Sequence, residues 1–208
     1  MISLFLNTSS NYLSLCLYKD NKILTSIHKK MDKDLSKETL FLIESILKKE
    51  NLTPKNIDEI ICTRGPGSFT GLRVGVTISK TFAYFLNKKL CSISSLEVMA
   101  LSTEADIKVP IIDARRGYVF SAIYDKDNNI LLEESYIKLE ELQKIVATHK
   151  GKKIFISNDN FGFETVSFNP NFENITTSNF KKEENPMTFV PNYLKKTEAE
   201  EKLNDCKS

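Results

Sequence analysis

The chain has 208 residues, a formal net charge of +2 at pH 7 and four cysteines. This length is sufficient to bury a core as one domain or as two small ones. The net charge is too small to indicate nucleic acid or a membrane as a partner by itself. The cysteines, Cys16, Cys62, Cys91 and Cys206, have no Cys-x-x-Cys spacing, and three of them lie in apolar runs. We therefore expect buried thiols and a reducing compartment.

Two further classes are disfavoured by the sequence. No apolar run approaches the roughly 20 residues that a membrane helix needs, and no basic, apolar leader begins the chain, so we expect a cytoplasmic protein without a membrane partner. The two histidines, His28 and His149, lie far apart in the sequence. Because metal catalysis usually needs three clustered protein ligands, we expect no metal site, and a metallopeptidase is disfavoured.

Taken in chain order, hydrophobic periodicity predicts six elements in the first half. They are three strands, a helix, a strand and a helix, at residues 2–6, 12–17, 23–28, 35–50, 57–62 and 74–86. The order is therefore β-β-β-α-β-α.

A similar order begins again near residue 111. Three strands are predicted at 111–113, at 118–124 and from residue 130. A helix at 139–148 and a final strand at 153–157 follow. When the two halves are aligned, Tyr12 falls on Tyr118 and Tyr18 on Tyr124. A period near half the chain indicates duplicated domains rather than a solenoid, although two hairpins of similar composition would give the same match.

A duplicated three-strand meander that carries helices is the plan of the actin-like ATPase fold, also called the ASKHA or ribonuclease H-like fold. We therefore predict an α/β protein with an actin-like domain over 1–104 and a reduced second copy with a C-terminal tail over 105–208. The second copy is reduced because residues 157–185, rich in Asn and Phe, show no clear periodicity and are predicted as loop.

Four of the seven glycines fall within residues 65–75, between a predicted strand and a predicted helix. Glycine permits left-handed dihedrals and close backbone approach, and free N–H groups converge at a helix N-terminus. Function is therefore expected at this turn. Its candidate residues are Gly65, Gly67, Ser68, Thr70, Gly71 and Arg73.

This glycine-rich turn matches none of the common fingerprints. Only three residues separate Gly67 from Gly71, and Leu72 stands where a Walker A loop has its lysine. The Rossmann spacing fails by one residue. The central residue is Phe69 and not the serine of a nucleophile elbow. A phosphate cradle and a tight turn that only shapes the helix start, with Ser68 or Thr70 as N-cap, both stay open.

As a whole, residues 65–75 resemble the signature of the TsaB (YeaZ-type) proteins, the dimerization subunit of the bacterial complex that makes threonylcarbamoyladenosine in tRNA. Most of the chain shares this resemblance, and only residues 157–185 match poorly. The further similar stretches are 4–9, 94–97, 112–119 and 191–194.

The resemblance also implies a function. It implies the actin-like fold and a non-catalytic scaffold that binds a homologous catalytic subunit, TsaD, which would carry ATP and metal while this chain alone binds no cofactor. A TsaE-like ATPase would join the pair, and this chain would contact tRNA only through the complex. A homodimer of the free chain is a further expectation.

In actin-like phosphotransferases, the first turn and its counterpart in the second domain supply carboxylates that hold the metal and the nucleotide phosphates. The corresponding positions here are Asn7 and Asp113, a possible vestigial nucleotide site. Asn7 is a poorer metal ligand than a carboxylate, and TsaB-type sequences more often have aspartate there. Asp113 has the alternative of pairing with Arg115 or Arg116. A small actin-like ATP-dependent phosphotransferase is therefore the alternative function.

The helix predicted over 74–86 carries apolar residues over an arc of roughly 200°, about twice what contact with a sheet requires. Small residues run through this arc at four-residue spacing and allow a second helix to approach closely. We therefore predict a partner interface on the two helices of the first half. Its residues are Phe41, Gly75, Val76, Ser79, Phe82 and Ala83. The alternative is that the two helices pack on each other.

Overall fold

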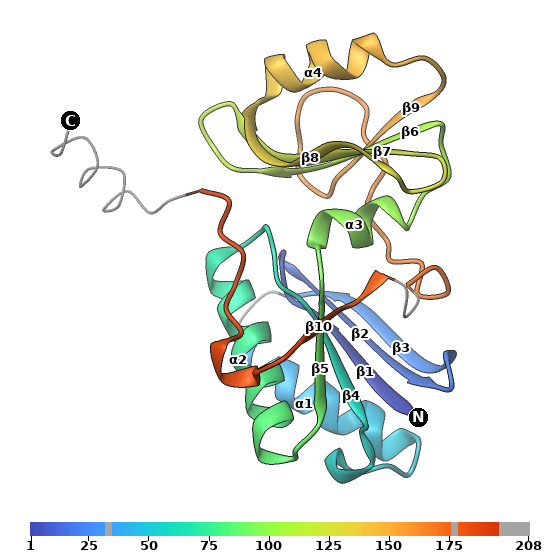
Figure 1. Cartoon of the computed structure of the whole chain (residues 1–208), viewed down its shortest axis with the longest axis vertical. Helices are drawn as coiled ribbons and strands as arrows, with labels where there is room; N and C mark the ends of the chain where they lie inside the picture. Colours follow the sequence, from blue (N-terminus) through green and yellow to red (C-terminus); the bar gives the residue numbers. More distant parts are fainter. Residues whose placement is uncertain (32–34, 176–178, 196–208) are drawn as a thin grey trace, which may run out of the picture.

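The computed structural model describes residues 1–31, 35–175 and 179–195 and contains two β-sheets (Figure 1). The first sheet consists of β1 (Ile2–Asn7), β2 (Tyr12–Lys19), β3 (Lys22–Lys30), β4 (Glu59–Thr63), β5 (Lys89–Ile93) and β10 (Lys181–Glu183). The second consists of β6 (Ile107–Asp113), β7 (Tyr118–Asp125), β8 (Ile130–Lys138) and β9 (Lys153–Ile156).

The helices cover the outer faces of both sheets and fill the space between them (Figure 1). They are α1 (Leu35–Lys49), α2 (Phe69–Phe85), α3 (Ser95–Ala100) and α4 (Leu139–Thr148), with short 3₁₀ helices η1 (Pro54–Asn56) and η3 (Pro186–Thr188). In Figure 1, α1 and α2 lie on the outer face of the first sheet, α4 lies on the outer face of the second, and α3 lies between the sheets. Among the described residues, no helix is both long and apolar enough to cross a membrane.

The strand order shows the duplication directly. The first sheet runs β10-β5-β4-β1-β2-β3 and the second β8-β7-β6-β9. In each sheet the opening strand pairs antiparallel with the next strand and parallel with the strand that follows a helix: β1 with β2 and β4, and β6 with β7 and β9. This confirms the α/β, duplicated actin-like fold. In the described part of the second half, β9 lies at the edge of its sheet. Its counterpart in the first sheet, β4, is followed by two more strands, β5 and β10, so the second copy is the shorter one.

Three apolar cores hold the layers together. One lies between the first sheet and its outer helices, and another between the second sheet and α4. The middle core contains side chains of both sheets and of α3, including Phe5, Leu96 and Tyr124. Because strand side chains alternate between faces, neighbours such as Leu4 and Phe5 enter different cores.

The stretch predicted as loop over 157–185 is largely irregular, but that prediction is wrong at its end, where β10 joins the first sheet beside β5. Its apolar side chains also have a structural role, since Phe168, Phe172 and Ile175 are buried in the middle core. The chain thus returns to the first half: in Figure 1 the red segment leads from β10 through η3 alongside α2. The division into domains at 104/105 stays a prediction.

The buried thiols expected from the sequence are confirmed for the three cysteines that the structure describes. Cys16, Cys62 and Cys91 are buried and unbonded to one another. Burial raises the pKa of each thiol to about 12. Since the thiolate is the reactive form, these residues are core side chains without nucleophilic character. Cys206 lies outside the described residues.

Candidate functional site

The glycine-rich turn packs directly against the loop that follows β1. A Cβ atom on Gly67 would overlap the carbonyl oxygen of Ser9, and one on Gly71 would overlap that of Thr8. One helical turn further on, a Cβ on Gly75 would overlap Oγ1 of Thr8. The Thr8 hydroxyl donates to the carbonyl oxygen of Gly71 at 2.7 Å. The three glycines are therefore needed so that the chain's own first loop can cross the start of α2.

Ser68 caps the start of α2 and is one of the two N-cap residues that the sequence predicted. Its side-chain oxygen accepts a hydrogen bond from the backbone N–H of Gly71 at 3.3 Å, and its own N–H donates to the carbonyl oxygen of Ser9 at 2.7 Å. Thr70 is exposed in the first turn of the helix and is not the cap. The helix therefore begins at Phe69 and not near residue 74, because the second part of the glycine-rich turn is helical.

The C-terminal segment covers the other side of the turn. The N–H of Asn192 donates to the carbonyl oxygen of Arg64 at 2.6 Å. A Cβ on Gly65, whose φ is +118°, would lie 2.7 Å from the carbonyl oxygen of Asn192. Arg73 also contacts this segment, since its Nε donates to the Tyr193 hydroxyl at 3.3 Å. The turn is thus held between two distant parts of the same chain.

A cleft of about 780 Å³ lies between the two halves of the molecule. The loop after β1, the start of α2 and the loop after β6 form its walls. The wall residues that carry polar groups include Ser10, Ser68, Thr70, Asp113, Arg115 and Asp159. This is the place where the actin-like resemblance predicts a nucleotide, so its two key positions decide what it can bind.

Asn7 and Asp113 occupy equivalent positions, as the last residues of β1 and β6, but they do not form a joint site. Asn7 is only 2% exposed, and its Oδ1 accepts hydrogen bonds from the N–H and hydroxyl of Ser9 and from the Thr63 hydroxyl, at 2.9, 2.7 and 3.0 Å. Its oxygen is therefore already engaged within the chain and does not line the cleft.

Asp113 is exposed and lines the cleft. Its Oδ1 accepts a hydrogen bond from the backbone N–H of Arg115 at 2.8 Å, and its own N–H donates to Oδ2 of Asp159 at 2.9 Å. The first contact shows that Asp113 caps its own turn through the backbone of Arg115. Across the described residues, no group of three His, Cys, Asp or Glu side chains is placed to hold a metal ion.

The small residues predicted for the partner interface lie on the inner side of α2, which corrects that prediction. Gly75, Val76, Ser79 and Ala83 are buried, and Val76 and Ala83 belong to the core between α2 and its own sheet. Phe82 is half-buried against the same core. The four-residue spacing therefore admits β1 and β4 of this chain and not a partner helix.

The exposed apolar surface lies on other faces of the two helices. Phe41, which the sequence predicted at the partner interface, is 66% exposed on α1, and Phe85 is 77% exposed at the end of α2. Leu40 and Tyr84 are also exposed, and the rings of Tyr84 and Phe85 meet edge to face with centroids 5.4 Å apart. We call these four residues the helix surface. The sequence showed the wide apolar arc of α2 but not which part of it faces the sheet.

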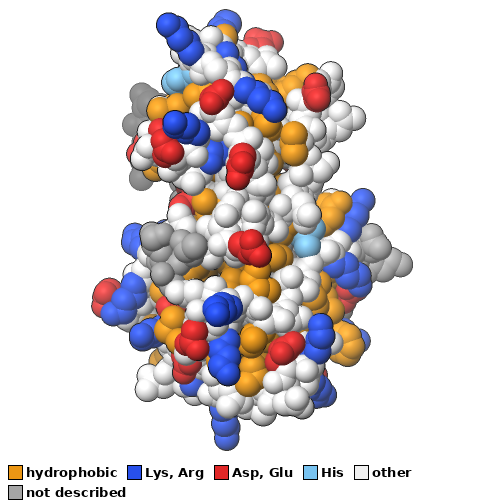
Figure 2. Space-filling model, turned by 90° about the vertical axis from the view of Figure 1, so that its right-hand side faces the viewer, with side chains coloured by type: hydrophobic (Ala, Val, Ile, Leu, Met, Phe, Trp, Pro, Cys, Tyr) orange, Lys and Arg blue, Asp and Glu red, His pale blue; other side chains and the backbone are white. Residues whose placement is uncertain are grey.

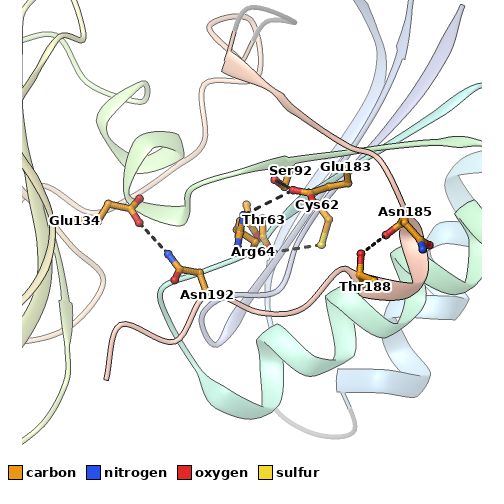
Figure 3. A network of polar contacts seen from close by, with 9 residues as sticks. All are labelled: Cys62, Thr63, Arg64, Ser92, Glu134, Glu183, Asn185, Thr188 and Asn192. Carbon is orange, nitrogen blue, oxygen red and sulfur yellow. Dashed lines mark hydrogen bonds and ion pairs between the residues drawn. The ribbon is translucent and has the colours of Figure 1, made fainter. Parts of the chain in front are cut away.

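A polar network connects the C-terminal segment to both halves (Figure 3). Arg64 lies 3.8 Å from the carboxylate of Glu183, which accepts a hydrogen bond from the Ser92 hydroxyl at 2.5 Å. Asn192 reaches the second half, where its side-chain amide donates to Glu134 at 3.2 Å. A smaller cavity of about 270 Å³ lies beside these residues.

Burial raises the pKa of Glu134, although a hydrogen bond from Ser94 and the positive charge of Arg64 oppose the rise. A carboxyl group with a raised folded-state pKa stabilises the fold fully below the ordinary glutamate pKa of about 4.3, and this contribution is lost as the pH rises through the folded-state value. Glutamine is neutral throughout. We therefore expect the melting temperature of Glu134→Gln to rise relative to wild type as the pH increases above about 4.3. A constant or falling difference in melting temperature would contradict this assignment.

The fold and the cleft together define the class of this protein: a duplicated ribonuclease H-like protein in which a buried asparagine ends the first strand. Two solved structures share the fold: YeaZ from Pseudomonas aeruginosa, and a protein from the same organism described as similar to peptidase YeaZ. They superpose with TM-scores of 0.73 and 0.74 at 18% and 19% identity, and each comparison covers 93% of this chain and 99% of the other.

The family described as "TsaD: tRNA N6-adenosine threonylcarbamoyltransferase" matches residues 23–203. The chain therefore belongs to this family, and within it to the TsaB (YeaZ) type. The tRNA threonylcarbamoyladenosine biosynthesis protein TsaB of Bacillus subtilis is 32% identical over 133 residues, which span 63% of this chain and 58% of that protein. TsaB of Escherichia coli is 28% identical over 131 residues, which span 61% and 56%.

Proposed function

We propose that this chain is a non-catalytic subunit that binds a TsaD-like homologous subunit and supports it in forming threonylcarbamoyladenosine next to the anticodon of ANN-decoding tRNAs. The relatives named TsaB are described as proteins of this biosynthesis, which supports the assignment. In this proposal ATP and metal are bound by the TsaD-like subunit, a TsaE-like ATPase joins the pair, and the complex works in the cytoplasm. The free chain pairs with a second copy when the TsaD-like subunit is absent.

One observation carries the non-catalytic part of the proposal. The side-chain oxygen of Asn7 is saturated by three donors of this chain, and the glycine-rich turn is filled by the first loop. The two features that would hold the metal and phosphates of a nucleotide are thus used internally.

The helix surface supports the binding part. Contiguous exposed apolar side chains are typical of protein interfaces, whereas single exposed ones carry no information. The neighbouring helices α1 and α2 each carry an adjacent pair of exposed apolar side chains. Phe41 and Phe85 are the most exposed phenylalanines of the described chain. In the proposal, this surface replaces the buried small residues as the contact with the TsaD-like subunit.

The alternative, a small ATP-dependent phosphotransferase, is favoured by the cleft itself, where Asp113 and Asp159 face the open space. Steady-state ATP turnover by the purified chain distinguishes the two functions. Because the first-half counterpart of Asp113 is Asn7, whose side-chain oxygen is already engaged within the chain, we expect no turnover within the range of about 1–1000 per second that is usual for enzymes. Turnover in this range that is abolished by Asp113→Ala would contradict the non-catalytic proposal and support the phosphotransferase.

A further inference from the structure

We propose that a band of stacked aromatic rings and cations on this chain binds single-stranded RNA directly. The band crosses from α2 over the C-terminal segment to β7 and β8. Its residues are Phe69, Arg73, Tyr118, Tyr136, Lys138, Tyr193 and Lys195. This goes beyond the proposed function, which assigns no direct contact with RNA to this chain.

The lower part of this aromatic–cation band lies at the start of α2. The rings of Phe69 and Tyr193 stack with centroids 5.1 Å apart, and the Arg73 guanidinium lies 4.0 Å above the Phe69 ring. Phe69 and Tyr193 are 46% and 40% exposed, so the stack keeps open ring surface. Burial therefore does not explain why two large rings are placed side by side here.

The upper part lies on the second sheet. The rings of Tyr118 and Tyr136 are nearly parallel, with centroids 4.6 Å apart. Lys138 lies 6.0 Å from the Tyr118 ring centroid and Lys195 5.4 Å from that of Tyr136. Tyr136 and Lys138 are two residues apart in β8 and share one face of the sheet, which keeps ring and ammonium together.

The C-terminal segment joins the two parts into one surface. Tyr193 contacts the lower stack and Lys195 the upper one, and two residues span at most about 7 Å. The segment is held in place by Asn192. Its backbone N–H donates a hydrogen bond to the carbonyl oxygen of Arg64 in the first half, and its side-chain amide donates one to the carboxylate of Glu134 in the second half (Figure 3). The two stacks are therefore neighbours on a fixed path across the junction of the halves.

The chemistry of this band favours RNA over an acidic protein. Within the part of the chain that the structure describes, Arg73, Lys138 and Lys195 form no ion pair, so their charges are available to phosphates. Proteins that bind single strands combine such cations with rings on which bases stack. An acidic peptide would use the cations and leave the exposed rings without a role.

The positive charge of the band is local, since the net charge of the whole chain is only +2. Figure 2 shows the side of the molecule away from α2 and the C-terminal segment, where acidic and basic side chains are interspersed over both halves. Glu134 shares the face of β8 with Tyr136, but its carboxylate accepts the Asn192 amide. We therefore expect the band to bind a short single-stranded segment of RNA. A duplex would need a wider basic surface.

The test is binding of a short, labelled, single-stranded oligoribonucleotide of mixed sequence to the full chain without any TsaD-like protein. We expect salt-dependent binding that weakens about tenfold or more in the double variant Arg73→Gln with Lys195→Gln. Because each phosphate contact contributes about 0.7 to the salt slope of single strands, the slope should fall by about 1.4. The matched control, Lys126→Gln with Lys150→Gln, removes the same charge at exposed sites outside the band and should leave binding unchanged.

Tyr136→Leu tests the rings separately, since it keeps an apolar side chain and removes the stack. Its expected result is weaker binding to RNA with unchanged binding to polyglutamate. The proposal is overturned if RNA does not bind, if the control pair weakens binding as much as the band pair, or if polyglutamate binds as tightly as RNA without dependence on the rings. Melting curves identify any variant that unfolds, and the double charge variant then decides alone. Because no TsaD-like protein is present, failure here leaves the proposed pairing untouched.

Discussion

A Gly71→Ala variant is expected to lose about 1–3 kcal/mol of unfolding free energy, the cost usual for overpacking a fitted contact. The reason is the carbonyl oxygen of Thr8, which a Cβ atom on Gly71 would overlap. Intrinsic helix propensity predicts the opposite sign, because alanine is about 1 kcal/mol better than glycine inside a helix. The direction of the change therefore separates the two explanations.

The matched control is Thr77→Ala, which places alanine at an exposed position of the same helix. It should be neutral or slightly stabilising, as propensity predicts. Chemical denaturation of both variants gives the comparison. If Gly71→Ala were as stable as wild type, the first loop would not need the close approach, and the glycine-rich turn would again be open to a ligand.

The second large effect concerns the helix surface. A double variant, Phe41→Asp with Phe85→Asp, is expected to lower affinity for a TsaD-like subunit about 100-fold or more, a loss of about 2.7 kcal/mol. Both side chains are largely exposed, so the fold should be retained. Calorimetric titration with the TsaD-like protein of the same organism measures the change.

Ile130→Asp is the control for this experiment, because Ile130 is 54% exposed on β8, away from both helices. It should bind with wild-type affinity. Ser79→Leu should behave differently from both: Ser79 is fully buried, so the substitution should lower the stability of the monomer and affect pairing only as a consequence. Unchanged affinity of the Phe41 and Phe85 double variant would remove the helix surface from the interface.

Sequence periodicity predicted most of the fold because it records burial. The apolar runs of the first three strands, the broad apolar arcs of the helices and the repeated meander all correspond to observed elements. It missed β5 and α3, which are short and lie in one nearly continuous buried run, where strand and helix patterns look alike. It also missed β10, whose pairing depends on a partner strand far away in the sequence.

The candidate site was predicted less well, for a physical reason. Glycine density located the turn correctly, but it could not show that Thr8 and Ser9 occupy the space that the glycines open. The small-residue spacing in α2 likewise predicted a close approach without its direction. The stack of Phe69 with Tyr193 joins residues that are neighbours only after folding, so no local pattern could predict it.

The most direct test of a non-catalytic TsaB-type subunit is the threonylcarbamoyladenosine content of ANN-decoding tRNAs, measured by mass spectrometry in cells depleted of the chain and complemented with variants. Asp113→Ala should restore the modification as wild type does, because in the proposed function the cleft of this chain performs no chemistry. The Phe41→Asp, Phe85→Asp double variant should fail to restore it while remaining folded. The account would be contradicted if Asp113→Ala failed and the double variant restored the modification, since the essential residue would then lie in the cleft and not on the helix surface.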